Sequence, residues 1–98
     1  MLKKNYYKNG DSCRVWFYLP PEVNAKKAAL VGDFNDWDED ANPMKVKKDG
    51  TFYTAVTLEK GQDYQFRYLL DGERWENDWE ADDYIQNETG KENSVVRV

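Results

Sequence analysis

The chain has 98 residues, the length of one domain, and its 19 acidic and 14 basic side chains give a net charge of −5. It has no histidine, a single cysteine, no long apolar run and no signal-peptide core at its start. These features exclude histidine-based catalysis, multi-cysteine zinc sites, internal disulfides and membrane spans, and they favour a cytoplasmic setting. The acids gather in residues 33–40 and 71–92, and such a surface repels phosphate backbones and anionic lipids, so we expect neither nucleic acid nor a membrane as partner.

Alternating apolar and polar residues, the pattern of half-buried β-strands, mark the first half of the chain. The alternation begins at Cys13–Leu19 and stops at two prolines, which cannot donate to a strand ladder. Residues 27–34 form a second predicted strand that is apolar on both faces in its middle. Met44–Lys48 alternates again, and we expect Met44 and Val46 to face the core.

Turn signals separate the predicted strands of the second half. Asp49-Gly50 is a hairpin signal that leads into a strand over residues 52–58. The next predicted strand is Asp63–Leu70, whose even-numbered residues are apolar or aromatic. The tight turn Asp71-Gly72 then returns the chain through Glu73–Trp75.

The last predicted strand is Val95–Val98, and the only helical signal is one turn over Glu80–Asp83. About seven short strands with frequent turns predict an all-β fold, an immunoglobulin-like antiparallel β-sandwich. We expect one domain over residues 1–98, with its core from about residue 13 to residue 98. The aromatic residues expected in that core are Phe17, Phe52, Tyr64, Phe66 and Tyr68.

The tryptophans in the acidic loops are not explained by this core. Trp37 follows an apolar strand directly, and it either covers the end of the sandwich or forms a platform on which a ligand stacks. Trp75 and Trp79 lie just past a hairpin, and at most one of them is expected in the core. Arg67 points outward, where it either pairs with an acid or donates to ligand hydroxyls. The polar run 87–94 is either turn chemistry or a source of hydroxyl-binding groups.

Two chemistries that the many acids suggest do not fit. Asp36, Asp38 and Asp40 have the spacing of a calcium loop, but Ala41 and Lys47 stand where an EF-hand needs glycine and glutamate. Glycosidases need one carboxyl group in an apolar pocket, whereas these acids lie in solvated loops of a chain too short for a deep cleft. We therefore expect no metal, no cofactor and no catalysis.

Three motifs, in order and well spaced, resemble carbohydrate-binding module family 48. They are Leu30–Trp37, Tyr64–Trp75 and Glu92–Val96, and the resemblance covers nearly the whole chain from Cys13 on. The family includes the N-terminal domains of isoamylases and glycogen branching enzymes and the glycogen-binding domain of the AMP-activated protein kinase beta subunit. The resemblance implies an early-set immunoglobulin-like sandwich that binds α-1,4-glucan, with catalysis carried by a separate barrel domain.

The resemblance also assigns the sugar-binding positions. Trp37 and Trp75 match the two tryptophans that stack on glucose rings in the kinase branch of the family. Arg67 stands where that branch has a sugar-binding lysine, and Asn93 matches an asparagine that contacts sugar hydroxyls.

Two departures from the kinase branch concern the rim of this predicted site. Thr89 and Lys91 replace a leucine and a threonine that help to clamp the glucan there. Trp79 stands where a proline is more usual. These changes imply a looser clamp, or an additional aromatic platform at Trp79.

The leading hypothesis is therefore a non-catalytic module that binds glycogen-type or starch-type α-glucan. The alternative is an accessory domain without a sugar site of its own, whose acidic loops face a basic patch on a glycogen-metabolising enzyme. A third hypothesis, a minimal glycosidase, predicts reducing ends released from glycogen, and we expect none.

Overall fold

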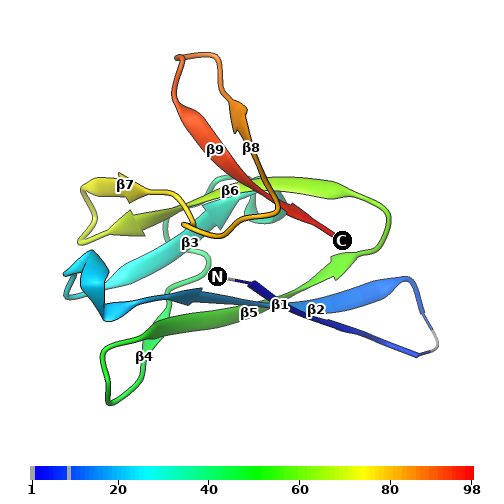
Figure 1. Ribbon diagram of the computed structural model, residues 1–98, viewed down its shortest axis with the longest axis horizontal. Helices are drawn as coiled ribbons and strands as arrows, with labels where there is room; N and C mark the ends of the chain where they lie inside the picture. Colours follow the sequence, from blue (N-terminus) through cyan, green and yellow to red (C-terminus); the bar gives the residue numbers. More distant parts are fainter. Residues whose placement is uncertain (1, 9) are drawn as a thin grey trace.

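The computed structural model describes residues 2–8 and 10–98, and in it the chain forms two facing antiparallel sheets (Figure 1). Met1, where the predicted domain begins, lies outside the described residues. One sheet has the strand order β1–β2–β5–β4 and the other β3–β6–β9–β8, with β7 paired to the C-terminal part of β6. The strands are β1 Leu2–Tyr6, β2 Ser12–Leu19, β3 Ala28–Gly32, β4 Lys45–Val46, β5 Phe52–Glu59, β6 Asp63–Leu70, β7 Arg74–Glu76, β8 Asp83–Gln86 and β9 Glu92–Arg97. The fold class predicted from the sequence is confirmed.

The core lies between the two sheets and is rich in aromatic rings. Phe17 of β2 meets Phe66 of β6 edge to face, with ring centroids 5.1 Å apart, and Phe66 meets Tyr68 in the same way at 5.6 Å. Phe52 is also buried, and Tyr64 packs partly buried against the cluster. The aromatic core expected from the alternation is thus confirmed, and T-shaped ring pairs add to the free energy gained by burial.

The structure corrects two expectations of local structure. Val46 is 58% exposed rather than buried, because β4 has two residues and pairs only with β5 at the margin of the sheet. Glu80–Asp83 forms no helical turn. Instead, the backbone N–H of Asp82 donates to Val95 at 3.0 Å, and strand β8 begins at Asp83.

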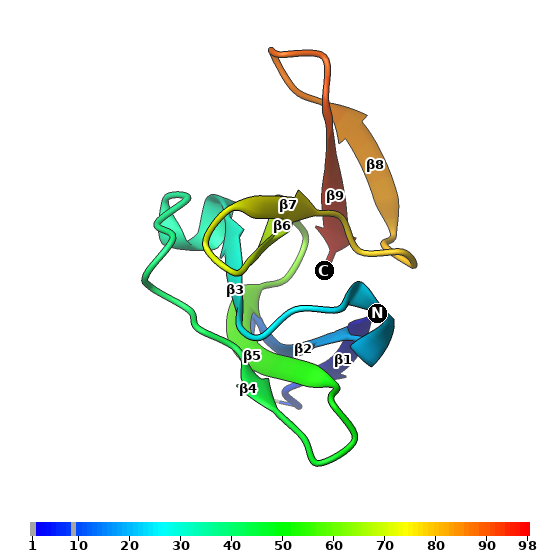
Figure 2. The same ribbon diagram turned by 90° about the vertical axis from the view of Figure 1, so that its left-hand side faces the viewer.

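The described residues form nine strands where about seven were expected, because β1 and β8 lack the alternation that predicts a strand. Both are edge strands in which most residues are exposed, and each is held by a single neighbour, β2 and β9 respectively. The β8–β9 hairpin extends from the body of the sandwich (Figures 1 and 2). In the described part of the chain, helical structure is limited to two 3-10 turns, η1 Pro21–Val23 and η2 Asp33–Asn35.

Strand β6 is central to the β3–β6–β9–β8 sheet and contributes to its outer face. It pairs with β3 along one side and with β9 and β7 in succession along the other. Phe66, Tyr68 and Leu70 point into the core, so Arg67 and Leu69 point to the outer face. Every segment that carries a predicted site residue is joined to β6 directly or through β9.

Candidate functional site

Arg67 and Trp75 form the centre of the outer face of the β3–β6–β9–β8 sheet. The register of β6 with β7 places Trp75 opposite Leu69. Leu69 lies two residues after Arg67 and therefore on the same face of the sheet. The Arg67 guanidinium carbon lies 4.7 Å from the centroid of the Trp75 ring, which is a cation–π distance. Trp75 remains 40% exposed. The half-buried Arg67 guanidinium therefore lies over the ring of an exposed indole.

Arg67 is held by this aromatic contact rather than by an acid. No salt bridge between residues that the structure describes includes Arg67, although its chain segment is surrounded by acidic loops. Its Nε atom is buried, and no described group accepts a hydrogen bond from it. A buried donor without an acceptor is unusual in a folded protein. The surface ion pair considered from the sequence does not form.

Asp33 links Trp37 to strand β6, although no described contact joins Trp37 to Arg67 or Trp75. The indole Nε1 of Trp37 donates to Oδ1 of Asp33 at 3.1 Å, and Oδ2 of Asp33 accepts the backbone N–H of Gln65, in β6, at 2.7 Å. Trp37 has a left-handed backbone with φ of 58° and is half-buried. One carboxylate thus ties the Trp37 loop to the strand that carries Arg67.

Asn93 belongs to an amide network on the same face. Its Nδ2 donates to Oε1 of Gln65 at 3.1 Å, and its Oδ1 accepts from Nδ2 of Asn87 at 3.3 Å. Asn93 is only 6% exposed, so most of its carboxamide is already engaged. Gln65 is the residue that sequence reasoning missed. It lies on the outward side of β6, two residues before Arg67, and that periodicity was the available signal.

Thr89 and Lys91 lie at the tip of the β8–β9 hairpin and connect to Asn93 through Asn87. The Thr89 hydroxyl donates to Oδ1 of Asn87 at 2.6 Å, and the backbone N–H of Lys91 donates to the same oxygen at 3.1 Å. Both residues are exposed. The turn is therefore ordered by one asparagine, which in turn contacts the buried Asn93.

Trp79 is not brought to this group. It is 53% exposed and lies in the loop between β7 and β8. The neighbouring Asp78 is buried and anchors that loop to the core, where the Tyr68 hydroxyl donates to Asp78 Oδ2 at 2.8 Å. Among the described contacts, none joins Trp79 to Arg67 or Trp75.

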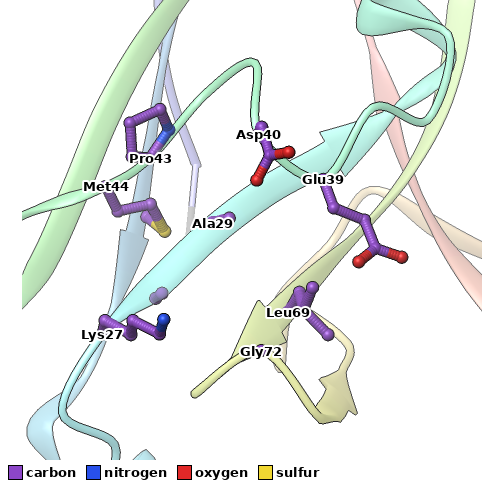
Figure 3. Close-up of a pocket in the computed structure, with 9 residues that line it drawn as sticks. Lys27, Ala29, Glu39, Asp40, Pro43, Met44, Leu69 and Gly72 are labelled. Atoms are coloured by element: carbon purple, nitrogen blue, oxygen red, sulfur yellow. The ribbon is translucent and has the colours of Figure 1, made fainter.

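A cleft of about 420 Å³ adjoins the site, between the loop that follows Trp37 and the β6–β7 turn. Figure 3 shows the carboxylates of Glu39 and Asp40 on one side of the cleft and Leu69 with Gly72 on the other. Its lining is Lys27, Ala28, Ala29, Glu39, Asp40, Pro43, Met44, Leu69 and Gly72. An apolar floor with carboxylate acceptors at the rim suits a ligand that has apolar faces and hydroxyl edges.

The β6–β7 turn that presents Trp75 is clamped by Asp71. The backbone N–H groups of Lys26 and Lys27 donate to Oδ1 of Asp71 at 2.8 and 3.1 Å. These bonds, from Lys26 first, hold the pKa of Asp71 below its ordinary value of 3.8. Arg74 reinforces the clamp, since its guanidinium donates to the carbonyl oxygens of Val23 and Asn24 at 3.1 and 3.0 Å.

Comparison with known proteins shows the family of the chain. The family described as Carbohydrate-binding module 48 (Isoamylase N-terminal domain) matches residues 5–85. The chain belongs to this family. Its immunoglobulin-like sandwich is that of a carbohydrate-binding module, and the matched range contains Trp37, Arg67, Trp75 and Trp79. Thr89, Lys91 and Asn93 lie beyond it.

Two relatives of this carbohydrate-binding module 48 chain are enzymes of much greater length. It is 50% identical over 38 residues to a 1,4-alpha-glucan-branching enzyme of Emericella nidulans, which covers 39% of the chain and 6% of the relative. It is 33% identical over 69 residues to the 1,4-alpha-glucan branching enzyme GlgB of Butyrivibrio fibrisolvens, which covers 70% of the chain and 11% of the relative. The matched chain thus spans about a tenth or less of each enzyme. Among the described residues, no helix is long and apolar enough to cross a membrane.

Proposed function

We propose that this module binds α-1,4-glucan without catalysis, by stacking glucose rings on Trp37 and Trp75. Arg67 supplies hydrogen-bond donors to sugar hydroxyls, and Asn93 is the second polar anchor, held in its network with Gln65 and Asn87. Thr89 and Lys91 form a polar rim at the hairpin tip. The observation that carries the proposal is the exposed Trp75 ring packed against the half-buried Arg67, with Trp37 and Asn93 both tied to strand β6.

The chemistry of the face supports a neutral sugar as ligand. Indole faces stack on the apolar faces of pyranose rings, and guanidinium and amide groups bond to hydroxyls. A neutral ligand is indifferent to the net charge of −5. The names of the two relatives refer to 1,4-alpha-glucan, which favours this polymer among neutral sugars.

The carboxylates support binding rather than hydrolysis. A glycosidase needs a carboxylic acid whose pKa is raised by an apolar pocket. The pKa values of Asp49, Asp71 and Asp83 are instead lowered, chiefly by backbone N–H donors. We therefore propose that catalysis lies outside these 98 residues, in any larger protein to which the module belongs.

Calorimetric titration with maltoheptaose tests the proposal. We expect a dissociation constant roughly in the micromolar to millimolar range, because a few stacked rings on an open face give modest affinity. Trp75→Ala and Trp37→Ala should each abolish measurable binding, whereas Trp79→Ala should leave the affinity within about twofold. Cellohexaose serves as the linkage control. Equal affinity in all four proteins, or no heat at millimolar maltoheptaose, would contradict the proposal.

A further inference from the structure

The outer face of the β1–β2–β5–β4 sheet lies on the opposite side of the sandwich from Trp75 and carries aromatic rings between cations. We call it the basic-aromatic face, and it consists of Arg14, Trp16, Tyr18, Lys45, Lys47 and Tyr53. Strand register assembles it, since Tyr53 of β5 stands opposite both Tyr18 of β2 and Lys45 of β4. All three rings are half-buried, and the three cations are exposed.

The cations of this face lie over the rings. The rings of Trp16 and Tyr18 are 6.5 Å apart and nearly parallel, at 18°. The Arg14 guanidinium lies 5.3 Å from the Trp16 centroid, and the Lys47 ammonium lies 5.3 Å from Tyr18 and 5.7 Å from Tyr53. These distances are within cation–π range, so the rings hold positive charge close to the sheet.

Among the described residues these cations form no salt bridge, although Lys47 interacts electrostatically with Asp49 in the turn between β4 and β5. The salt bridges between described residues join Lys4 to Asp82 and Arg97 to Asp63 and Asp83, and they leave Arg14, Lys45 and Lys47 without one. The register adds a fourth cation, Lys3, opposite Trp16, and the only acid on this face of strands β1, β2, β4 and β5 is Glu59 at its far end, opposite Ser12. A protein with net charge −5 thus presents one positive face, separate from its acidic loops.

We propose that the basic-aromatic face docks an acidic segment of a partner protein. Carboxylates would pair with Arg14, Lys45 and Lys47, while apolar side chains of the same segment would lie along the rings. A neutral glucan has no charge to pair with these cations, whereas carboxylates do. A nucleic acid is a longer polyanion, which the net charge of −5 repels. This docking does not depend on the proposed sugar site. It also differs from the accessory-domain alternative, in which acidic loops of this chain face a basic patch on the partner.

Fluorescence polarisation with a short fluorescein-labelled polyglutamate peptide at low salt tests the docking. We expect saturable binding that weakens as salt rises, and a loss of about tenfold or more in Lys45→Glu/Lys47→Glu. Lys8→Glu/Lys60→Glu makes the same charge change elsewhere and should retain binding. Circular dichroism of both double variants checks that they are folded. If the sugar site is as proposed, both should also bind maltoheptaose with unchanged affinity.

Each other outcome overturns the proposal. No saturable binding, or equal loss in both double variants, would show that the face has no selective role. A single-stranded oligonucleotide of equal charge that binds tighter than the peptide would identify a general polyanion site. Sedimentation that shows self-association of the chain at low salt, abolished by Lys45→Glu/Lys47→Glu, would identify a second copy of this chain as the occupant.

Discussion

The polar pair Tyr68–Asp78 is fully buried. The Tyr68 hydroxyl is fully buried and donates to a carboxylate oxygen of Asp78, which is also fully buried, at 2.8 Å. Burial, and next the charge of Asp78, raise the pKa of Tyr68 well above 10.0, so its hydroxyl stays protonated and remains a donor. The pair therefore fastens the loop after β7 to the centre of the molecule.

Tyr68→Phe should destabilise the protein by about 1–3 kcal/mol, because it removes a donor from a buried carboxylate without changing the packing volume much. Urea denaturation followed by circular dichroism measures the change. Since Tyr68 points away from the outer face, maltoheptaose affinity should stay as in the wild type. A variant as stable as the wild type would show that the bond contributes nothing net.

Arg67 and Gln65 show how far sequence reasoning reaches at the residue scale. Alternation along β6 places both on the outward face, and the family resemblance marks Arg67. The role of Gln65 appears only when Asn93, 28 residues away, donates to it. Contacts between residues far apart in sequence depend on strand order and register, which alternation alone does not determine.

At the scale of elements, β3 and β6 approach each other unusually closely at Gly32. A Cβ at this position would lie 2.6 Å from the carbonyl oxygen of Gln65 and 2.8 Å from Cβ of Phe66. The backbone of Gly32 is extended, with φ of −171°, so space rather than torsion requires glycine here. Gly32 also accepts the backbone N–H of Trp37 at 2.9 Å, which links this contact to the site.

Gly32→Ala should therefore cost about 1–3 kcal/mol, because the strands must separate to admit a methyl group. Thermal denaturation measures the loss. Gly10→Ala is the matched control, since a Cβ there meets no atom within 4 Å, and it should leave the melting temperature unchanged. Equal melting temperatures for the two variants would contradict the close approach.

The β6–β7 turn makes stability depend on pH through Asp71. The folded pKa of Asp71 lies below 3.8, so its ionised form stabilises the fold above that pH, and the contribution is lost as the pH falls through the folded value. Asp71→Asn keeps an acceptor oxygen but cannot ionise, and asparagine tolerates the left-handed φ of 54°. The melting-temperature gap between wild type and Asp71→Asn should shrink from pH 7 to pH 3.

Glu73→Gln is the control for this pH dependence, because it removes one negative charge from the same turn without touching the bonds from Lys26 and Lys27. Its melting-temperature gap to the wild type should change less between pH 7 and pH 3. A gap for Asp71→Asn that widens on acidification would contradict the sign of the pKa shift.

Edge strands mark the limit of sequence reasoning for elements. Strands β2, β5 and β6 bury apolar residues at alternate positions on the core side, so alternation predicts them. Strands β1 and β8 bury little, and their partners β2 and β9 hold them mainly by backbone hydrogen bonds, which leave no mark in the sequence. The prediction that Val46 is buried is wrong for a related reason. The alternation around Val46 is that of a strand, but the two-residue strand β4 lies at the margin of the sheet and leaves Val46 exposed.

At the scale of the whole molecule, the two outer faces of the sandwich differ in charge and chemistry. One carries the Arg67–Trp75 pair beside acidic loops, and the other carries cations over aromatic rings. Because the core separates them, a glucan on one face and a protein segment on the other would not compete. The family resemblance predicted the first face, whereas the second depends on the register of four strands, which only the structure provides.

The central claim is that glucan stacks on Trp37 and Trp75, and the indole N–H signals of the four tryptophans in a proton–nitrogen correlation spectrum test it most directly. Addition of maltoheptaose should shift the signals of Trp37 and Trp75 and leave that of Trp16, on the opposite face, in place. Trp16 thus serves as an internal control in a single sample. A shift at Trp16 alone, or no shift at Trp37 and Trp75 at saturating sugar, would contradict the account.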